Sequence, residues 1–326
     1  MKKISIVTPC YNEEGNVYNM FKSIQKVFEK IPEYEYEHIF IDNCSLDRTP
    51  EILREIAKED NRVKVILNVR NFGPGRSGGY ALLQATGDAV IGLACDFQEP
   101  PELIPDFIKK WEEGYKVVFG QKNESEESKI MFAIRTLYYK IIKKTSEAKQ
   151  LENVTGFGLY DKEVIKMMRW IDDPNPYFRG TIAELGYEVG LIQYIQPKRR
   201  AGKSSYNIFS YIDTAINGMI NSSQIPLRIA SYFGVIMSGI SFLVGLIYFV
   251  LKLIYWNSFH MGVAPLIIGL FFLGAVQIAF IGVLGEYIGA ILMRVTRRPL
   301  VVEKERINFE NSNIEREVMM KGADRR

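Results

Sequence analysis

Short apolar runs recur through the first third of the chain, and amphipathic stretches separate them. The runs end near Thr8, Asp42 and Leu67, and each is followed by a loop that contains Asn, Gly or Pro. Strands and helices that alternate in this way predict an α/β domain with a mostly parallel sheet and helices on both of its faces. The predicted strands cover 4–8, 38–42, 63–67 and 88–96, and the predicted helices cover 16–31, 51–60 and 78–84.

Residues at the ends of these elements predict where helices begin and where ligands bind. Thr49 is predicted as the N-cap of the helix that follows it, with Pro50 at the first helical position. A later apolar run leads into Asp96, Gln98 and two prolines, so the strand must end there and a helix can start at Glu102. Asp96 and Gln98 are therefore expected at the carboxyl end of a buried strand, where open α/β sheets bind ligands. A solvated Asp in an ordinary turn is the simpler alternative.

The last third of the chain carries two long runs without charged residues. The run 229–251 and the central part of the second run, 263–285, are each longer than the roughly 30 Å hydrocarbon core at about 1.5 Å per residue. Upstream, 208–220 has an apolar stripe that is typical of a helix lying in the membrane interface. Arginines flank the outer ends of the pair, and the positive-inside rule then predicts both termini in the cytoplasm. These arginines are Arg228, Arg294, Arg297 and Arg298.

These patterns divide the chain into four parts. We predict a catalytic domain over 1–205, a juxtamembrane amphipathic helix over 206–226, two transmembrane helices over 227–290 and a cytoplasmic tail over 291–326. The sequence assigns no structure to the tail. The protein is thus expected to be a multi-pass protein of the inner (plasma) membrane, with its catalytic domain in the cytoplasm. A buried helical hairpin of a soluble protein is the alternative, which runs of this length disfavour.

Composition excludes several function classes. The formal net charge is only +3, so the global charge does not point to a nucleic-acid partner. Cys10, Cys44 and Cys95 lack metal-ligand spacing and suit a reducing compartment better than a disulfide framework. No G-x-G-x-x-G follows the first strand and no Walker lysine loop is present, which disfavours a dinucleotide enzyme and a P-loop NTPase.

Three segments together resemble family 2 glycosyltransferases, which have the GT-A fold: 5–14 (SIVTPCYNEE), 41–49 (IDNCSLDRT) and 96–102 (DFQEPPE). More narrowly, the chain is similar to the polyprenyl-phosphate glycosyltransferases, the group that includes dolichol-phosphate mannose synthase and bacterial bactoprenol glucosyltransferases. Further segments that support this narrower resemblance are 156–161, 177–180, 199–204, 285–289 and 298–300.

The resemblance implies a nucleotide-sugar donor, with a UDP-sugar expected. It also implies that Asp42 or Glu13 accepts hydrogen bonds from the base or the ribose. Mg²⁺ or Mn²⁺ at Asp96, with Gln98 beside it, would neutralise the diphosphate as it leaves. The residues implied in binding the nucleotide sugar are Pro9, Tyr11, Glu13, Asp42 and Asp96.

The chain departs from the family pattern at three positions. Ala94 stands where relatives usually carry a carboxylate, and Gly156 and Gly158 stand where many relatives carry an Asp and an Arg. A hard ion such as Mg²⁺ can bind through one or two protein carboxylates together with phosphates and water. Asp96 with Gln98 is therefore expected to suffice, while the roles of the missing Asp and Arg cannot be transferred.

The implied acceptor is polyprenyl (undecaprenyl) phosphate. A phosphate monoester with a second pKa of about 6 is largely anionic near neutral pH, so it can attack the anomeric carbon without a general base if cations position it. Alternatively, the basic residues near the membrane segment only form a solvated basic face beside the bilayer. The residues implied for the acceptor phosphate are Arg135, Arg200, Lys203 and Ser204, and the predicted catalytic set is Asp96, Arg200 and Lys203.

The sequence thus predicts a hexosyltransferase that moves one sugar, with inversion, to a lipid phosphate at the cytoplasmic membrane face. A processive family 2 polymerase is one alternative, but 166–170 (KMMRW) lacks the Gln of the usual Gln-x-x-Arg-Trp motif, and two spans make a poor channel. A catalytically impaired relative that acts as a membrane assembly module is another. Ala94, Gly156 and Gly158 favour it, while Asp96, Asp42 and the basic motif at 199–204 oppose it. A homo-oligomer is compatible with the sequence.

Overall fold

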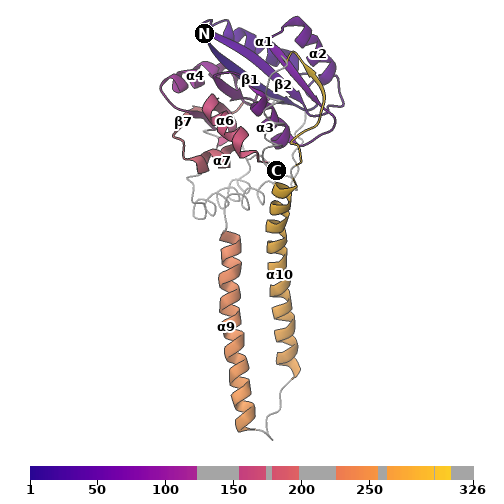
Figure 1. Ribbon diagram of the computed structural model, residues 1–326, viewed down its shortest axis with the longest axis vertical. Coiled ribbons are helices and arrows are strands. Elements are labelled where there is room, and N and C mark those ends of the chain that lie inside the picture. Colours follow the sequence, from indigo (N-terminus) through magenta and orange to yellow (C-terminus); the bar gives the residue numbers. More distant parts are fainter. Residues whose placement is uncertain (123–153, 174–177, 198–224, 256–262, 297, 310–326) are drawn as a thin grey trace, which may run out of the picture. The chain divides into compact units, whose positions relative to one another are not determined.

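The computed structural model describes residues 1–122, 154–173, 178–197, 225–255, 263–296 and 298–309 (Figure 1). The chain divides into two compact units. The first holds the sheet and its helices, and it includes the segment from Arg298 onward. The second holds two long helices.

The first unit is built on an eight-stranded sheet in the order β7-β5-β6-β4-β1-β2-β3-β8. The central strands β4, β1, β2 and β3 run parallel, whereas β6 and β8 pair antiparallel with β4 and β3. The predicted α/β class with a mostly parallel sheet is therefore confirmed. The strands are β1 (Lys2–Cys10), β2 (Tyr34–Asp42), β3 (Val63–Asn68), β4 (Ala89–Gly92), β5 (Val117–Lys122), β6 (Val154–Asp161), β7 (Val189–Tyr194) and β8 (Glu303–Ile307).

Helices cover both faces of the sheet, as the alternating pattern predicts (Figure 1). Apolar residues of α1, α2 and α4 share one core cluster, and those of α3, α6 and α7 share the other. Neighbouring residues of β2 separate in the same way, because Phe40 belongs to the first cluster and Ile39 and Ile41 to the second. The helices are α1 (Val17–Phe28), α2 (Thr49–Glu59), α3 (Pro74–Gln84), a 3₁₀ turn η1 (Pro101–Leu103), α4 (Ile104–Glu112), α6 (Lys162–Ile171) and α7 (Phe178–Leu185).

The strand register brings four strand ends to one edge of the sheet. Cys10 of β1 lies opposite Asp42 of β2, and Asp42 lies opposite Leu67 of β3. On the other side of β1, Val7 lies opposite Gly92, the last residue of β4. The loops that follow β1, β2, β3 and β4 are therefore neighbours, and we call this side the carboxyl edge.

Two local predictions were wrong. Thr49 is not an N-cap: α2 begins at Thr49 itself, and Arg48 occupies the cap position. The Thr49 hydroxyl instead accepts a hydrogen bond from the Glu13 backbone N–H at 2.8 Å, so it serves the loop after β1. The strand predicted to run to Asp96 ends at Gly92, because the chain turns away four residues earlier.

The segment that the sequence predicted as a tail contributes a strand. β8 pairs antiparallel with β3 and forms one edge of the sheet, with Ile307 opposite Val65. Ion pairs attach it to the helices, since Arg54 of α2 lies 2.8 Å from Glu305. Asn308 completes the attachment through hydrogen bonds to the Ala57 and Val63 carbonyls at 2.7 and 2.9 Å.

The second unit contains the long helices α9 (Ile225–Ile254) and α10 (Val263–Val295). Within them, Ala230–Leu251 and Phe272–Leu292 are long and apolar enough to cross a membrane, and neither window is buried. Phe233 and Phe280 pack with ring centroids 5.8 Å apart. The two predicted apolar spans are confirmed as helices, which indicates membrane association. The amphipathic helix predicted upstream lies almost wholly outside the described residues.

Candidate active site

The loops after β1 and β2 bind each other at the carboxyl edge. The backbone N–H of Asn12 donates to Ser45 Oγ at 2.8 Å, and Asn12 Oδ1 accepts from the Leu46 N–H at 2.8 Å. Asn12 has φ of +56°, a left-handed conformation that Asn tolerates better than most residues. The two loops are thus held as one rigid unit that carries Tyr11 and Glu13.

Asp42 is buried at the end of β2, with 2% of its surface exposed. Burial raises the pKa of its carboxyl, and hydrogen bonds from Ser45 oppose that rise. The Ser45 N–H donates to Oδ2 at 3.0 Å and the Ser45 hydroxyl donates to Oδ1. Cys44, between them, has φ of +64°. The carboxylate is therefore oriented by its own loop and keeps further lone pairs for a ligand.

The loop after β3 joins this edge through asparagine side chains. Asn43 Nδ2 donates to Asn71 Oδ1 at 2.9 Å, and Asn43 Oδ1 accepts from the Phe72 N–H at 2.9 Å. Asn68 Nδ2 donates to Ser77 Oγ at 3.1 Å. The Asn68 Oδ1 atom is buried without a hydrogen-bond partner. An amide oxygen left in that state is an acceptor available at the carboxyl edge.

Asp96 lies in the loop after β4. The Leu93 N–H donates to the Val7 carbonyl at 3.0 Å, which keeps this loop beside β1. Asp96 is 6% exposed, and its Oδ1 accepts from the Gln98 N–H at 3.1 Å. Phe97 has φ of +61° although it is neither Gly nor Asn. A buried aromatic residue in this conformation is unusual, and such outliers concentrate at functional sites.

Glu99 is a residue that the sequence reasoning did not single out. Its Oε2 accepts from the Ala94 N–H at 2.6 Å, so the carboxylate folds back onto the loop that holds Asp96. The acid was visible within the 96–102 motif, but only the fold shows that its side chain reaches position 94. Within the described ranges, no group of three or more His, Cys, Asp or Glu residues could hold a metal ion. A metal here would therefore need non-protein oxygens besides Asp96 and Glu99.

Neither glycine of β6 readily accepts a larger side chain, for a different reason at each position. A Cβ built on Gly158 would lie 2.3 Å from the Val118 carbonyl oxygen, a distance at which something must shift. Gly156 has φ of +120°, a conformation that L side chains rarely adopt. The absence of an Asp and an Arg at these positions is thus matched by the backbone around them.

The predicted residues of the nucleotide-sugar site lie together at the carboxyl edge, whereas the predicted residues of the acceptor site are not among the described residues. Arg135, Arg200, Lys203 and Ser204 lie outside the described residues, so their roles stay predictions. Cys10, Cys44 and Cys95 are free. The residues gathered at the carboxyl edge are Pro9, Tyr11, Glu13, Asp42, Asp96 and Gln98.

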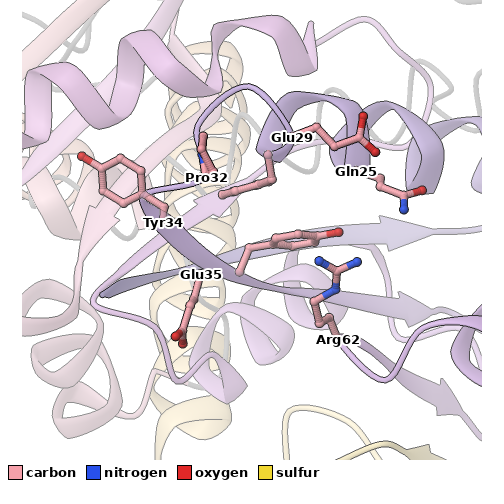
Figure 2. Close-up of a pocket in the computed structure, with 8 residues that line it drawn as sticks. Gln25, Glu29, Pro32, Tyr34, Glu35 and Arg62 are labelled. Carbon is pink, nitrogen blue, oxygen red and sulfur yellow. The ribbon is translucent and has the colours of Figure 1, made fainter.

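A pocket of about 530 Å³ lies at the opposite end of the same strands (Figure 2). Tyr34 and Tyr36, at the start of β2, line it together with Arg62, which precedes β3. Since Asp42 ends β2 six residues after Tyr36, the pocket lies roughly 20 Å from the carboxyl edge. This pocket is therefore separate from the predicted nucleotide-sugar residues, which lie at the carboxyl edge.

Residues 5–168 match the family described as glycosyl transferase family 2. The chain belongs to glycosyltransferase family 2. The matched residues contain all four loops of the carboxyl edge, so this edge is the candidate active site of a GT-A glycosyltransferase. The predicted family, fold and enzyme class are confirmed.

Curated relatives match this glycosyltransferase over nearly its whole length. The SfII prophage-derived bactoprenol glucosyl transferase of Shigella flexneri is 34% identical over 93% of this chain and 98% of its own. The prophage bactoprenol glucosyl transferase homolog of Escherichia coli (strain K12) is 32% identical over the same shares. The uncharacterized glycosyltransferase YkcC of Bacillus subtilis (strain 168) is 32% identical over 97% of this chain and 98% of its own.

Proposed function

We propose that this enzyme transfers a single glucose from UDP-glucose to bactoprenol (undecaprenyl) phosphate, with inversion at the anomeric carbon. The observation that carries the proposal is the similarity to bactoprenol glucosyl transferases over 93% of this chain. The family match covers only residues 5–168. The alignment with this relative is longer and extends into the part of the chain that contains α9 and α10. Relatives that share only the catalytic domain would not support the lipid acceptor in this way.

The donor lies across the ends of β1, β2 and β4. Asp42 accepts hydrogen bonds from the nucleoside, because Ser45 holds its carboxylate at a fixed orientation beside the loop that carries Tyr11. Tyr11 is half-buried and offers a ring face to the base. The diphosphate then points toward the loop after β4, where Asp96 lies.

The oxygen donors of that loop fit a hard divalent ion such as Mg²⁺ or Mn²⁺. Asp96 would hold the ion, with Gln98 beside it and Glu99 as a second carboxylate, because the Glu99 side chain reaches Ala94. When bound, such an ion neutralises charge on the departing diphosphate. The few protein carboxylates leave positions for phosphate oxygens of the donor, which couples metal binding to donor binding.

The acceptor enters as a phosphate anion and needs no general base. Arg135, Arg200, Lys203 and Ser204 position that phosphate in this proposal. His38 is unsuited to base catalysis, since it is fully buried inside β2 and burial lowers its pKa to about 3. The apolar helices α9 and α10 hold the enzyme at the membrane where the lipid resides, with both termini on the cytoplasmic side.

The test is direct transfer by the purified full-length protein. It is incubated with undecaprenyl phosphate and a panel of nucleotide sugars. The lipid product is weighed by mass spectrometry, and its anomeric configuration is determined by NMR. One added hexose from UDP-glucose, in the anomeric configuration opposite to that of the donor, is the expected result. Products with several sugars would indicate a processive enzyme, and no product with any donor would indicate the impaired relative.

The metal assignment has its own test that does not depend on turnover. Mn²⁺ binding to the full-length protein with UDP present is measured by electron paramagnetic resonance. Glu99→Gln should weaken Mn²⁺ binding about tenfold, because it removes one of the two carboxylates of the loop. Glu102→Gln, at an exposed position of η1, is the matched control and should change nothing. Equal binding by all three proteins would contradict a role for Glu99.

A further inference from the structure

Three arginines gather beside the loop after β3, and we call Arg70, Arg76 and Arg298 the arginine surface. The Arg70 guanidinium carbon lies 4.0 Å from the ring centroid of Phe72, and that of Arg76 lies 5.8 Å from the same centroid. Arg76 Nη2 donates to the Pro299 carbonyl at 2.8 Å, which ties the segment after α10 to the first turn of α3. Segments more than 220 residues apart thus place their cations together.

The charges of the arginine surface are not balanced. Within the part of the chain that the structure describes, none of the three guanidinium groups has a carboxylate within ion-pair distance. Elsewhere in the same unit, Arg54 and Arg306 pair with Glu305 and Glu303 at 2.8 and 2.7 Å. Burial lowers the pKa of Arg76, and the charges of Arg70 and Arg298 lower it further. An anion placed here would remove that repulsion.

One donor of the surface also lacks a partner. The Arg76 Nε atom is buried and has no hydrogen-bond partner. A guanidinium offers five N–H donors in a planar fork that matches phosphate geometry. The Nη2 donor of Arg76 is already used by Pro299, so the side chain is held in place with Nε–H still to be satisfied. Pro299 thus fixes a fork of the kind that binds phosphate oxygens at the arginine surface.

Exposed apolar side chains lie on the loops after β2 and β3. Val69 is 47% exposed, and its carbonyl lies 3.7 Å from the Cys44 thiol on the loop after β2. Leu46, on that same loop, is 86% exposed. Arginines next to exposed aliphatic side chains are the combination by which protein surfaces enter the headgroup layer of a bilayer.

One arginine of this surface follows an apolar helix in the sequence. Arg298 follows Val295, the last residue of α10, by three positions. Cations at that position, directly after a helix apolar enough to cross a bilayer, are where the positive-inside rule expects contact with the lipid surface. A free nucleotide gains nothing from that position, whereas a lipid phosphate does.

We propose that the arginine surface binds the phosphate of anionic lipid headgroups and seats the catalytic domain on the bilayer. The ligand class is a phospholipid with net negative charge, such as phosphatidylglycerol. This interaction goes beyond the transfer reaction, because it concerns the bulk lipid and not the acceptor.

The experiment uses the full-length protein in detergent, with bound lipids counted by native mass spectrometry. Phosphatidylglycerol and phosphatidylcholine are titrated separately into the wild type and the variants Arg70→Gln and Arg298→Gln. A cation near an anionic lipid surface contributes about 1 kcal/mol, so each variant should bind phosphatidylglycerol roughly fivefold more weakly. Phosphatidylcholine binding should not change. Arg62→Gln, an exposed arginine before β3 at the opposite end of the sheet, is the matched control and should bind both lipids as the wild type does.

Two further measurements make the outcome decisive. UDP affinity is measured for each variant, and inorganic phosphate is added as a soluble competitor. Unchanged UDP affinity with weakened phosphatidylglycerol binding supports the proposal, as does failure of millimolar phosphate to displace the lipid. Weakened UDP binding with unchanged lipid binding would assign the arginines to the donor and overturn it. An equal loss in Arg62→Gln would show a mere charge effect and would overturn it as well.

Discussion

The two ends of the same parallel strands have opposite chemistry. At the amino ends of β1 and β2, Glu37 is buried but receives hydrogen bonds from Lys3 and Lys64, both at 2.7 Å. Ser5 and Thr86 donate to its other oxygen at 2.5 and 2.8 Å. At the carboxyl ends, by contrast, the buried Asp42 carboxylate is held by Ser45 of its own loop, and burial raises the pKa of that carboxyl.

Three loops of the carboxyl edge carry backbone strain. Asn12, Cys44 and Phe97 have positive φ, and all three lie in loops of the carboxyl edge. Each such residue costs about 1 to 2 kcal/mol when it is neither Gly nor Asn. The amino ends therefore hold a carboxylate that stabilises the fold, and the carboxyl ends hold a carboxylate among strained loops that a ligand can reach. The predictions below separate these two roles.

The largest expected effect is on stability at the amino ends. Glu37→Gln should lower the free energy of unfolding by about 3 kcal/mol, because it leaves Lys3 and Lys64 without their common partner. The measurement is a thermal melt of the full-length protein in detergent. Glu35→Gln, an exposed neighbour on the same strand, is the control and should change stability by less than about 0.5 kcal/mol. Loss of transfer at low temperature, where the variant is folded, would contradict the division of roles.

Acid should weaken the fold through the same strand. Burial acts to raise the pKa of Glu37, but hydrogen bonds from Lys3, Lys64, Ser5 and Thr86 outweigh it and hold the pKa at about 2. A depressed folded-state pKa gives stability that is present above the unfolded value of 4.5 and is lost as the pH falls toward 2. Burial lowers the pKa of His38 to about 3. Stability therefore begins to fall near pH 6.5, where the unfolded chain takes up a proton that the folded chain does not. Melts across this range should show both steps, and Glu37→Gln should lack the lower one.

At the carboxyl edge the expected effect is on turnover. Asp96→Asn should reduce glucose transfer by about tenfold or more, because it removes the carboxylate proposed to hold the metal, while the melting temperature stays within a few degrees. Initial rates at saturating donor, measured with and without added Mn²⁺, check this. Full activity of the variant, or full activity of the wild type in excess chelator, would contradict the metal assignment.

The smallest expected effect tests the strain directly. Cys44→Asn should stabilise the protein by about 0.5 to 1 kcal/mol, since Asn tolerates the left-handed conformation at φ of +64°. Cys44→Val should destabilise it by more than that, because a branched side chain fits this conformation worst. Both changes are read as shifts of the thermal midpoint. Equal midpoints for the two variants would show that the loop relaxes without cost.

Local patterns in the sequence were enough to predict the α/β class, the order of the first strands and the two apolar helices. Each rests on spacing within one element: Val17, Met20, Phe21 and Ile24 repeat along one helix face, and all four are buried. The sequence could also predict that the residues of the nucleotide-sugar site lie together, for a similar reason. In a parallel sheet the carboxyl ends of the strands lie at one edge. Asp42, which ends β2, and Asp96, in the loop after β4, therefore lie at the same edge.

Only the tertiary structure decided the features that join distant segments. The strand β8 has the sequence EKERI, which contains no apolar run. It forms because β3 offers a free edge for pairing and because partners such as Arg54, 251 residues away in sequence, bind its side chains. Glu99 turns back to Ala94 because Phe97 adopts a left-handed conformation that local composition does not signal. The arginine surface likewise requires Arg76 and Pro299 to meet. Long-range pairing depends on which surfaces the folded core brings together, and no periodicity within a single segment encodes that.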